Sequence, residues 1–398
     1  MTSSASQATR AVRASIESDT QHCAVVPPLH LSSNFAFAGL GEPRQYDYTR
    51  SGNPTRDALA DALAELEGGA GAVVTSSGIA ALTLLTQLLE PGDTIIAPHD
   101  CYGGTYRLFE QQSRKGLFKV KFVDQTNLDA LRKAAECRPK IILAETPSNP
   151  LLRIVDIEKI SEIAKSAGAL LAVDNTFLSP ALQNPIKFGA DLVIHSTTKY
   201  INGHSDVVGG CVVAATDELA EKIAYWANCI GITGAPFDSF LTLRGIRTLH
   251  PRIKQHEESA SVIANLLNEH DQVAQVYYPG LESHPGHSIA KRQQRGFGGM
   301  VSFEVEGGEE EIRAFVHSLK FFSLAESLGG VESLVCHPAS MTHAPVSEEA
   351  RAEAGIGQNL IRLSVGLESC EDLIADLLEA LEAARSVCTL TPVATACA

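Results

Sequence analysis

The sequence lacks the features that would place the protein in a membrane, outside the cell or on nucleic acid. No apolar run approaches the roughly 18 residues that a membrane-spanning helix needs, and the amino-terminal stretch MTSSASQATRAVRAS has no apolar signal-peptide core. The 47 acidic residues outnumber the 32 basic ones, which gives a net charge of -15 and no basic stripe. We therefore expect a cytoplasmic protein without a membrane or nucleic-acid partner.

The sequence also lacks C-x-x-C spacing, internal repeats and low-complexity segments. Its nine cysteines are odd in number, which favours reduced thiols over a disulfide framework or a zinc site. We therefore expect no bound metal. The chain has 398 residues, more than one hydrophobic core usually supports, so two domains are expected.

Three regions differ in their residue pattern. Residues 1–60 are rich in proline, glycine and asparagine, which predicts an extended arm that lies on its own chain or on a neighbouring subunit. Residues 61–250 alternate short apolar runs with helical patterns, which is typical of a largely parallel sheet covered on both faces. Residues 251–398 predict a smaller α+β domain, with a disordered tail at 386–398.

The large region contains seven candidate strands, and ligands of such sheets bind beyond the carboxyl ends of the strands. These runs are GAVVTS (71–76), DTIIAP (93–98), FKVKFVD (118–124), KIILAE (140–145), ALLAVD (169–174), DLVIHS (191–196) and GGCVVAA (209–215). Four different chemical groups follow their ends. They are the carboxylate of Asp174, the amine of Lys199, the ring of Tyr102 and a helix start at Gly78.

Pyridoxal phosphate (PLP) would use all four groups. Its aldehyde needs an amine, which Lys199 supplies, and its pyridine nitrogen needs a carboxylate, which Asp174 supplies. Tyr102 offers a face on which the ring can stack. The phosphate would lie on backbone N–H groups at the helix start and on nearby hydroxyls. The residues expected there are Gly78, Ile79, Ser196 and Thr198.

Each of these residues alone also fits an ordinary structural role. A lysine after a strand is usually solvated, Asp174 would fit a turn, and Tyr102 would fit a half-buried surface ring. The order of the groups, each at the carboxyl end of a strand, favours the cofactor site. We interpret His195 and His204 as structural residues.

Long stretches of the chain resemble the PLP-dependent enzymes of cysteine and methionine metabolism, along nearly its whole length. The matching stretches are YDYTRSGNPTRDALADALAELEGGAGAV, APHDCYGGTYRLF, ETPSNPLLRIVDI, VDNTFLSPALQNP, HSTTKYINGHSDVVGG and LAESLGGVESL. The resemblance implies an α/β fold of the PLP-transferase (aspartate aminotransferase-like) type. It also implies a homotetramer built from two active dimers.

The resemblance further implies roles for residues that no pattern places. Tyr48 and Arg50, in the arm, would reach across the dimer to the phosphate of the neighbouring subunit. Arg362 would clamp the substrate α-carboxylate, a contact well suited to a guanidinium group. Asn149 and Ser327 would line the same site.

Within the family, the chain is most similar to bacterial enzymes that join O-succinylhomoserine and cysteine into cystathionine and succinate, a transsulfuration step of methionine biosynthesis. Arg107 would meet the distal carboxylate of the succinyl group, and Glu326 would receive the amino group of cysteine. Glu326 would equally fit a surface carboxylate. One alternative is cleavage of cystathionine to cysteine, 2-oxobutyrate and ammonia by the same residues. A non-catalytic PLP carrier is disfavoured because Lys199 and Asp174 are both present.

Overall fold

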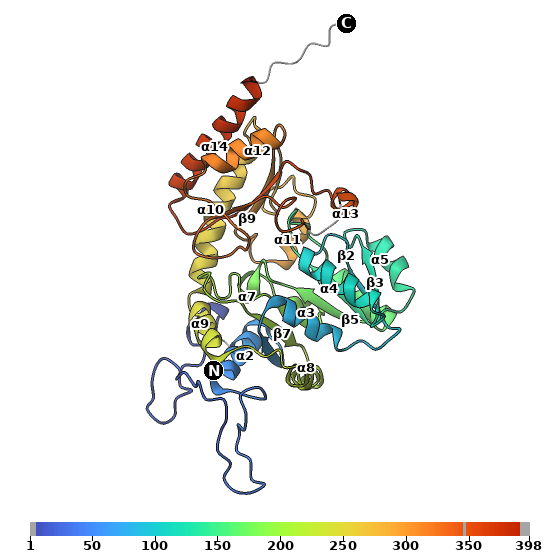
Figure 1. The fold of residues 1–398 in the computed structure, drawn as a ribbon, viewed down its shortest axis with the longest axis vertical. Helices are drawn as coiled ribbons and strands as arrows, with labels where there is room; N and C mark the ends of the chain where they lie inside the picture. Colours follow the sequence, from blue (N-terminus) through green and yellow to red (C-terminus); the bar gives the residue numbers. More distant parts are fainter. Residues whose placement is uncertain (1–4, 345–347, 391–398) are drawn as a thin grey trace.

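The computed structural model describes residues 5–344 and 348–390, which form two domains (Figure 1). The larger is built on a seven-stranded sheet of order β1-β7-β6-β5-β4-β2-β3. Its strands are β1 (Gly71–Thr75), β2 (Thr94–Pro98), β3 (Lys119–Val123), β4 (Ile141–Glu145), β5 (Leu170–Asp174), β6 (Leu192–His195) and β7 (Gly210–Ala214). Strand β7 runs antiparallel to both of its neighbours, and the other pairings are parallel. The expected, largely parallel sheet is therefore present.

Helices cover both faces of this sheet, so its strands are apolar on both sides. One face packs on α3 (Gly78–Thr86), α4 (Gly103–Arg114) and α8 (Asp217–Ile230). The other face packs on α2 (Pro54–Glu67), α5 (Leu128–Ala135), α6 (Ile157–Ala167) and α9 (Pro236–Ile246). Helices α8 and α9 are additional to the elements expected from the sequence.

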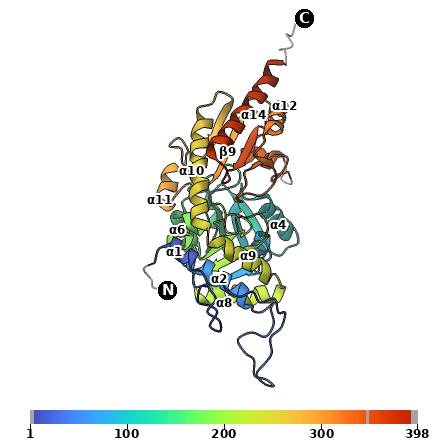
Figure 2. The same ribbon diagram turned by 90° about the vertical axis from the view of Figure 1, so that its left-hand side faces the viewer.

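The smaller domain is a five-stranded sheet of order β10-β11-β12-β9-β8, with helices packed against it (Figure 2). Its strands are β8 (Val273–Tyr277), β9 (Met300–Val305), β10 (Ser323–Leu324), β11 (Leu334–Cys336) and β12 (Leu360–Ser364). The helices of its core are α10 (Leu249–Asn268), α12 (Glu309–Ser318) and α14 (Cys370–Leu390). The short helices elsewhere are α1 (Gln7–Val12), α7 (Ser179–Leu182), α11 (His287–Gln293) and α13 (Glu348–Glu353), with a 3-10 helix at Pro185–Phe188.

Three boundaries expected from the sequence need correction. The arm ends at Asn53, not at residue 60, because the Asn53 side chain accepts the N–H groups of Thr55 and Arg56 and so caps α2. The division at residue 250 falls inside α10, which belongs to both domains. Helix α14 continues to Leu390, so residues 386–390 are helical instead of tail. The rest of the expected tail, residues 391–398, lies outside the described residues.

The arm between α1 and α2 consists of turns and isolated bridges, and it projects from the large domain (Figure 1). Asn34 pairs with Tyr48 in one such bridge. Large apolar side chains are exposed along it, with Leu31 67% and Leu40 107% exposed. No helix in the described parts of the chain is both long and apolar enough to cross a bilayer.

Candidate functional site

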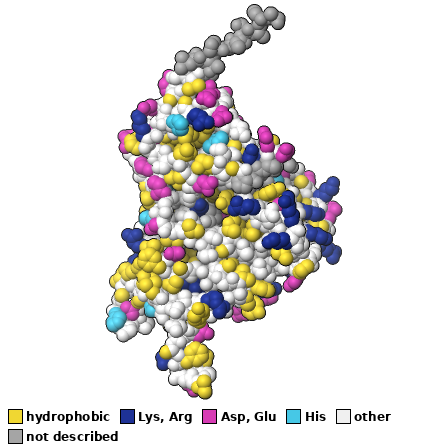
Figure 3. Space-filling view, in the orientation of Figure 1, with side chains coloured by type: hydrophobic (Ala, Val, Ile, Leu, Met, Phe, Trp, Pro, Cys, Tyr) yellow, Lys and Arg dark blue, Asp and Glu magenta, His cyan; other side chains and the backbone are white. Residues whose placement is uncertain are grey.

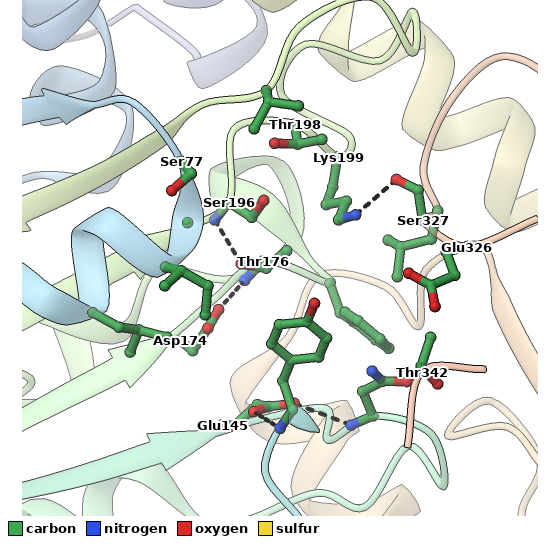
Figure 4. Close-up of a pocket in the computed structure, with 18 of the residues that line it drawn as sticks. Ser77, Glu145, Asp174, Thr176, Ser196, Thr198, Lys199, Glu326, Ser327 and Thr342 are labelled. Atoms are coloured by element: carbon green, nitrogen blue, oxygen red, sulfur yellow. Dashed lines mark hydrogen bonds between the residues drawn. The ribbon is translucent and has the colours of Figure 1, made fainter. Parts of the chain in front are cut away.

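A cavity of about 370 Å³ lies where the carboxyl ends of the large sheet meet the smaller domain (Figure 4). Most of the site residues expected from the sequence and the resemblance line it. They are Gly78, Ile79, Tyr102, Asn149, Asp174, Ser196, Thr198, Lys199, Glu326, Ser327 and Arg362. Residues far apart in the chain therefore come together in one cavity, and both domains contribute to it.

Three expected site residues lie outside the cavity lining of this single chain. Arg50 donates a hydrogen bond to the backbone oxygen of Asn228 at 2.9 Å, and its guanidinium group lies 5.6 Å from the ring centroid of Tyr48. Tyr48 is half exposed in the arm. Burial and the charge of Glu326 raise the pKa of the Tyr102 phenol, and Arg107, exposed on α4, is near enough for its charge to oppose that rise.

Lys199 lies in the turn that follows β6, and its side chain points into the cavity (Figure 4). Its Nζ donates a hydrogen bond to Ser327 Oγ at 2.7 Å. Burial lowers the pKa of Lys199 to about 8, with a further lowering by Arg362 and an opposing effect of Glu326. Far more of this amine is neutral near pH 7 than of an ordinary lysine. Ser327 takes a left-handed backbone conformation (φ 86°) to hold its hydroxyl there.

Asp174 ends β5 and lies at the same edge of the sheet. Its carboxylate accepts the N–H of Thr176 at 3.0 Å, and burial raises the pKa of this carboxyl group against the effect of that bond. A buried carboxylate is costly unless a cation or further donors meet it. A protonated ring nitrogen in the cavity would be such a cation, so Asp174 fits the partner that PLP requires.

The turn from β1 into α3 forms a cradle for an anion. Ser77 caps α3 by accepting the N–H of Ala80 at 3.0 Å, and Gly78 begins the helix. A Cβ atom at Gly78 would lie 2.8 Å from Ser196 Cβ, so the close approach of these two segments requires glycine. The positive end of α3 and the hydroxyls of Ser196 and Thr198 face the same cavity. This arrangement fits a phosphate group.

Arg362 stands on β12 of the smaller domain and is only 2% exposed. Its two terminal nitrogens donate to Asn149 Oδ1 at 2.7 Å and to the backbone oxygen of Ser327 at 2.9 Å. Its Nε is buried and has no acceptor among the described residues. A buried donor without a partner is costly. The carboxylate of a bound amino acid would supply the missing acceptor.

Several residues that line the cavity were not expected from the sequence. Glu145 ends β4 and Thr176 follows β5, so the reasoning about strand ends that found Asp174 applied to both. Thr342 reaches the cavity from a loop of the smaller domain, and no local pattern identifies it. His195, interpreted as structural, lies behind the site and pairs with the buried Glu67 at 2.7 Å between His195 Nε2 and Glu67 Oε1.

The model of the Cys/Met metabolism PLP-dependent enzyme family matches residues 8–382 of the chain. The protein belongs to this family. It is therefore a PLP-dependent enzyme, and PLP is its cofactor. The described residues hold no cluster of three or more histidine, cysteine or acidic side chains arranged to bind a metal ion.

Relatives within the Cys/Met metabolism family cover almost the whole chain. It is 55% identical to cystathionine gamma-synthase of Escherichia coli (strain K12), over 95% of this chain and 98% of that protein. It is 49% identical to cystathionine beta-lyase of Lactococcus lactis subsp. cremoris, over 94% and 98% respectively.

A solved structure also matches the fold. It is cystathionine gamma synthase from Xanthomonas oryzae pv. oryzae in complex with aminoacrylate and cysteine, with a TM-score of 0.95 and 60% identity. The match covers 96% of this chain and 99% of that one. The PLP-transferase fold expected from the resemblance is thereby confirmed.

Proposed function

We propose that the protein catalyses γ-replacement, in which cysteine displaces the succinate of O-succinylhomoserine and cystathionine forms. This would be a transsulfuration step of methionine biosynthesis. The observation that carries the proposal is a single cavity with a carboxylate clamp at Arg362 and a second, oppositely charged group at Glu326. A cavity with these two groups suits a product that is an amino acid at both ends. The Escherichia coli and Xanthomonas relatives are both named cystathionine gamma-synthase, which supports the same reaction for this protein.

When bound, PLP supplies an aldehyde and an electron-withdrawing ring. We assign its aldehyde to Lys199, its ring nitrogen to Asp174 and its ring face to Tyr102, which would also lie close to the substrate. The phosphate is assigned to four residues around the start of α3. These are Gly78, Ile79, Ser196 and Thr198.

Lys199 is also the proposed proton carrier. A pKa of about 8 leaves a useful fraction of its amine neutral near pH 7, which suits a group that must both accept and return protons. Its Nζ would take the proton from the substrate Cα, release that proton again, and then take one from Cβ, after which the succinate can leave from Cγ. The 2.7 Å hydrogen bond to Ser327 Oγ holds the amine at the cavity between these steps.

The substrate contacts follow from the charges around the cavity. Arg362 and Asn149 would bind the α-carboxylate, and Glu326 would bind the ammonium group of cysteine. Arg107 would bind the distal carboxylate of the succinyl group. Figure 3 shows lysine and arginine side chains gathered over the part of the large domain that carries α4 and α5, in a chain whose net charge is -15. A carboxylate-bearing substrate would meet a locally positive surface there.

We also propose that the arm completes the site of a neighbouring subunit within a homotetramer. Its exposed apolar side chains, such as Leu31 and Leu40, would be covered by that subunit. Tyr48 and Arg50 would then reach the neighbour's phosphate cradle. Mixed dimers of Arg50→Ala and Lys199→Ala subunits should regain activity, because one site per dimer would draw both intact residues from different chains. No recovery in verified mixed dimers would contradict the exchange.

Cleavage of cystathionine is the second candidate function, since Arg362 and Glu326 would bind the two ends of that substrate equally well. Product analysis by mass spectrometry separates the two. The enzyme should form cystathionine rapidly from O-succinylhomoserine and cysteine, and should release little 2-oxobutyrate from cystathionine alone. A tube with O-succinylhomoserine and no cysteine measures side elimination. Faster cleavage than synthesis would reject γ-replacement as the main activity. The cytoplasmic location expected from the sequence stays a prediction.

A further inference from the structure

Glu145 connects the two loops that carry Tyr102 and Asn149. It is the last residue of β4, its side chain lines the cavity, and it is 7% exposed. Its Oε2 accepts the N–H of Tyr102 at 3.0 Å, and its Oε1 accepts the N–H of Asn149 at 3.1 Å (Figure 4). One carboxylate therefore fixes the main chain on two sides of the cavity.

Both loops depend on this carboxylate. Tyr102 is the N-cap of α4 and makes no side-chain capping bond, and a negative charge is favourable at the start of a helix. The position of Asn149 in turn affects Arg362, because Asn149 Oδ1 accepts a hydrogen bond from Arg362. A continuous set of contacts thus runs from Tyr102 through Glu145 and Asn149 to Arg362.

The position of Glu145 is electrostatically unfavourable. Glu145 and Asp174 are register partners on β4 and β5, so their side chains lie on the same face of the sheet. Burial and the charge of Asp174 raise the pKa of Glu145 well above its usual range. A glutamine would avoid the repulsion, but its amide offers one acceptor where the two N–H groups need two. The need for both acceptors gives a physical reason for a carboxylate here.

We propose that Glu145 is a positioning residue. It would hold the aromatic ring of Tyr102 at a fixed position relative to Asn149 and Arg362, which would bind the substrate carboxylate. The proposal rests on the proposed function for the roles of those three residues. It does not depend on which acyl donor the enzyme uses, nor on synthesis rather than cleavage. Glu145 would act through its neighbours, without receiving a proton from the substrate.

The test compares two small amines that differ by a carboxylate. The PLP-loaded enzyme is titrated with glycine and with methylamine, and the change in the cofactor's visible absorption gives a dissociation constant for each. The wild-type enzyme should prefer glycine, because Arg362 binds its carboxylate. Glu145→Gln should reduce this preference about tenfold or more, by analogy with the loss of a hydrogen bond to a charged group. Glycine has no γ-leaving group, so the result is independent of the proposed reaction.

Asp376→Asn is the matched control. Asp376 is 2% exposed and accepts the N–H groups of Lys320 and Phe321, so it is also a buried carboxylate that binds two backbone donors. It lies outside the cavity lining. Asp376→Asn should lower the thermal midpoint and leave the preference for glycine unchanged. Equal preferences in wild type and Glu145→Gln would overturn the proposal.

Two further variants keep the test decisive. Glu145→Asp preserves the charge but is one methylene shorter, so it should also lose the preference for glycine. In an Asn149→Ala background, Glu145→Gln should reduce the preference far less than in the wild type, because the two residues act in one series of contacts. Full additivity would overturn the proposal. So would loss of PLP from both Glu145 variants while Asp376→Asn keeps it, since Glu145 would then serve folding alone.

Discussion

The two sides of the cavity are built in different ways. The proposed cofactor side comes from the carboxyl ends of β1, β5 and β6, with Asp174 as the last residue of its strand and Gly78 and Lys199 in the turns that follow theirs. The proposed substrate side comes mostly from the smaller domain, where Arg362 stands within β12 and Glu326 lies in an irregular loop, and the large domain adds Asn149. Rigid strand ends suit a cofactor that is the same in every turnover. A loop and one anchored arginine suit substrates that differ between relatives with the same cofactor.

The largest expected effect comes from removing the amine of the cofactor side. Lys199→Ala should lose the covalent attachment of PLP and reduce turnover by about 10³-fold or more, since both the nucleophile and the proton carrier disappear. Steady-state turnover and the visible spectrum of the purified protein measure this. An active Lys199→Ala enzyme with wild-type colour would falsify the assignment of the whole cofactor side.

Asp174→Asn should come next in size. The variant should still bind PLP, but it loses the charge that keeps the ring nitrogen protonated. One pKa unit corresponds to about 1.4 kcal/mol, so a change of two or more units should reduce turnover about 100-fold or more. The loss should be similar for every amino-acid substrate, as expected of a cofactor contact. A reduction below tenfold would show that Asp174 is not the partner of the ring nitrogen.

Arg107→Ala tests whether the substrate contacts extend beyond the cavity. Arg107 belongs to the large domain and lies outside the cavity lining. Loss of a charge-assisted contact of roughly 1.5–3 kcal/mol should reduce kcat/KM for O-succinylhomoserine about 10- to 150-fold. O-acetylhomoserine has no distal carboxylate and should lose much less. Equal losses for the two esters would assign Arg107 to the structure of α4 or to the cofactor.

The smallest expected effect is a shift in the pH dependence of covalent PLP binding, through which Glu326 on the substrate side influences Lys199 on the cofactor side. In the proposed role of Lys199, its neutral form would capture the aldehyde, so the rate at which apoenzyme binds PLP covalently should rise with pH to a midpoint near the pKa of about 8 and then level off. An unperturbed lysine would continue to gain neutral amine up to about pH 10.4. Glu326 raises the pKa of Lys199, so Glu326→Gln should move the midpoint to lower pH. Stopped-flow absorption measures both profiles, and a shift to higher pH would contradict the coupling.

The same contrast explains what the sequence alone can predict. Parallel strands bring their carboxyl ends to one edge, so the runs before Gly78, Asp174 and Lys199 place these groups together without a structure. Strand β12 is antiparallel to both of its neighbours, and antiparallel strands do not collect side chains at one end. The inward facing of Arg362 is set by the packing of two domains. Its role therefore came from resemblance to known enzymes.

Glu145, unlike Arg362, lies at a strand end where the sequence pattern applies, yet it was not among the expected site residues. It ends β4 as Asp174 ends β5, so the strand-end pattern applies to both residues, but the ring nitrogen of PLP needs only one carboxylate. Its partners are backbone N–H groups of Tyr102 and Asn149. Contacts to the main chain leave no signature in the identities of the contacted residues, so the sequence does not reveal which backbone groups Glu145 binds.

Helix α10 connects the two domains. It is one continuous 20-residue helix, about 30 Å long at 1.5 Å per residue. Leu249 and Ile253 are anchored in the large domain, and Ile263 and Leu267 are anchored in the smaller one. Arg252, in the first turn of the helix, donates a hydrogen bond to the backbone oxygen of Tyr200, the residue after Lys199, at 2.8 Å. The helix is therefore a rigid connection between the two cores, and rotation of one domain relative to the other would require this helix to bend.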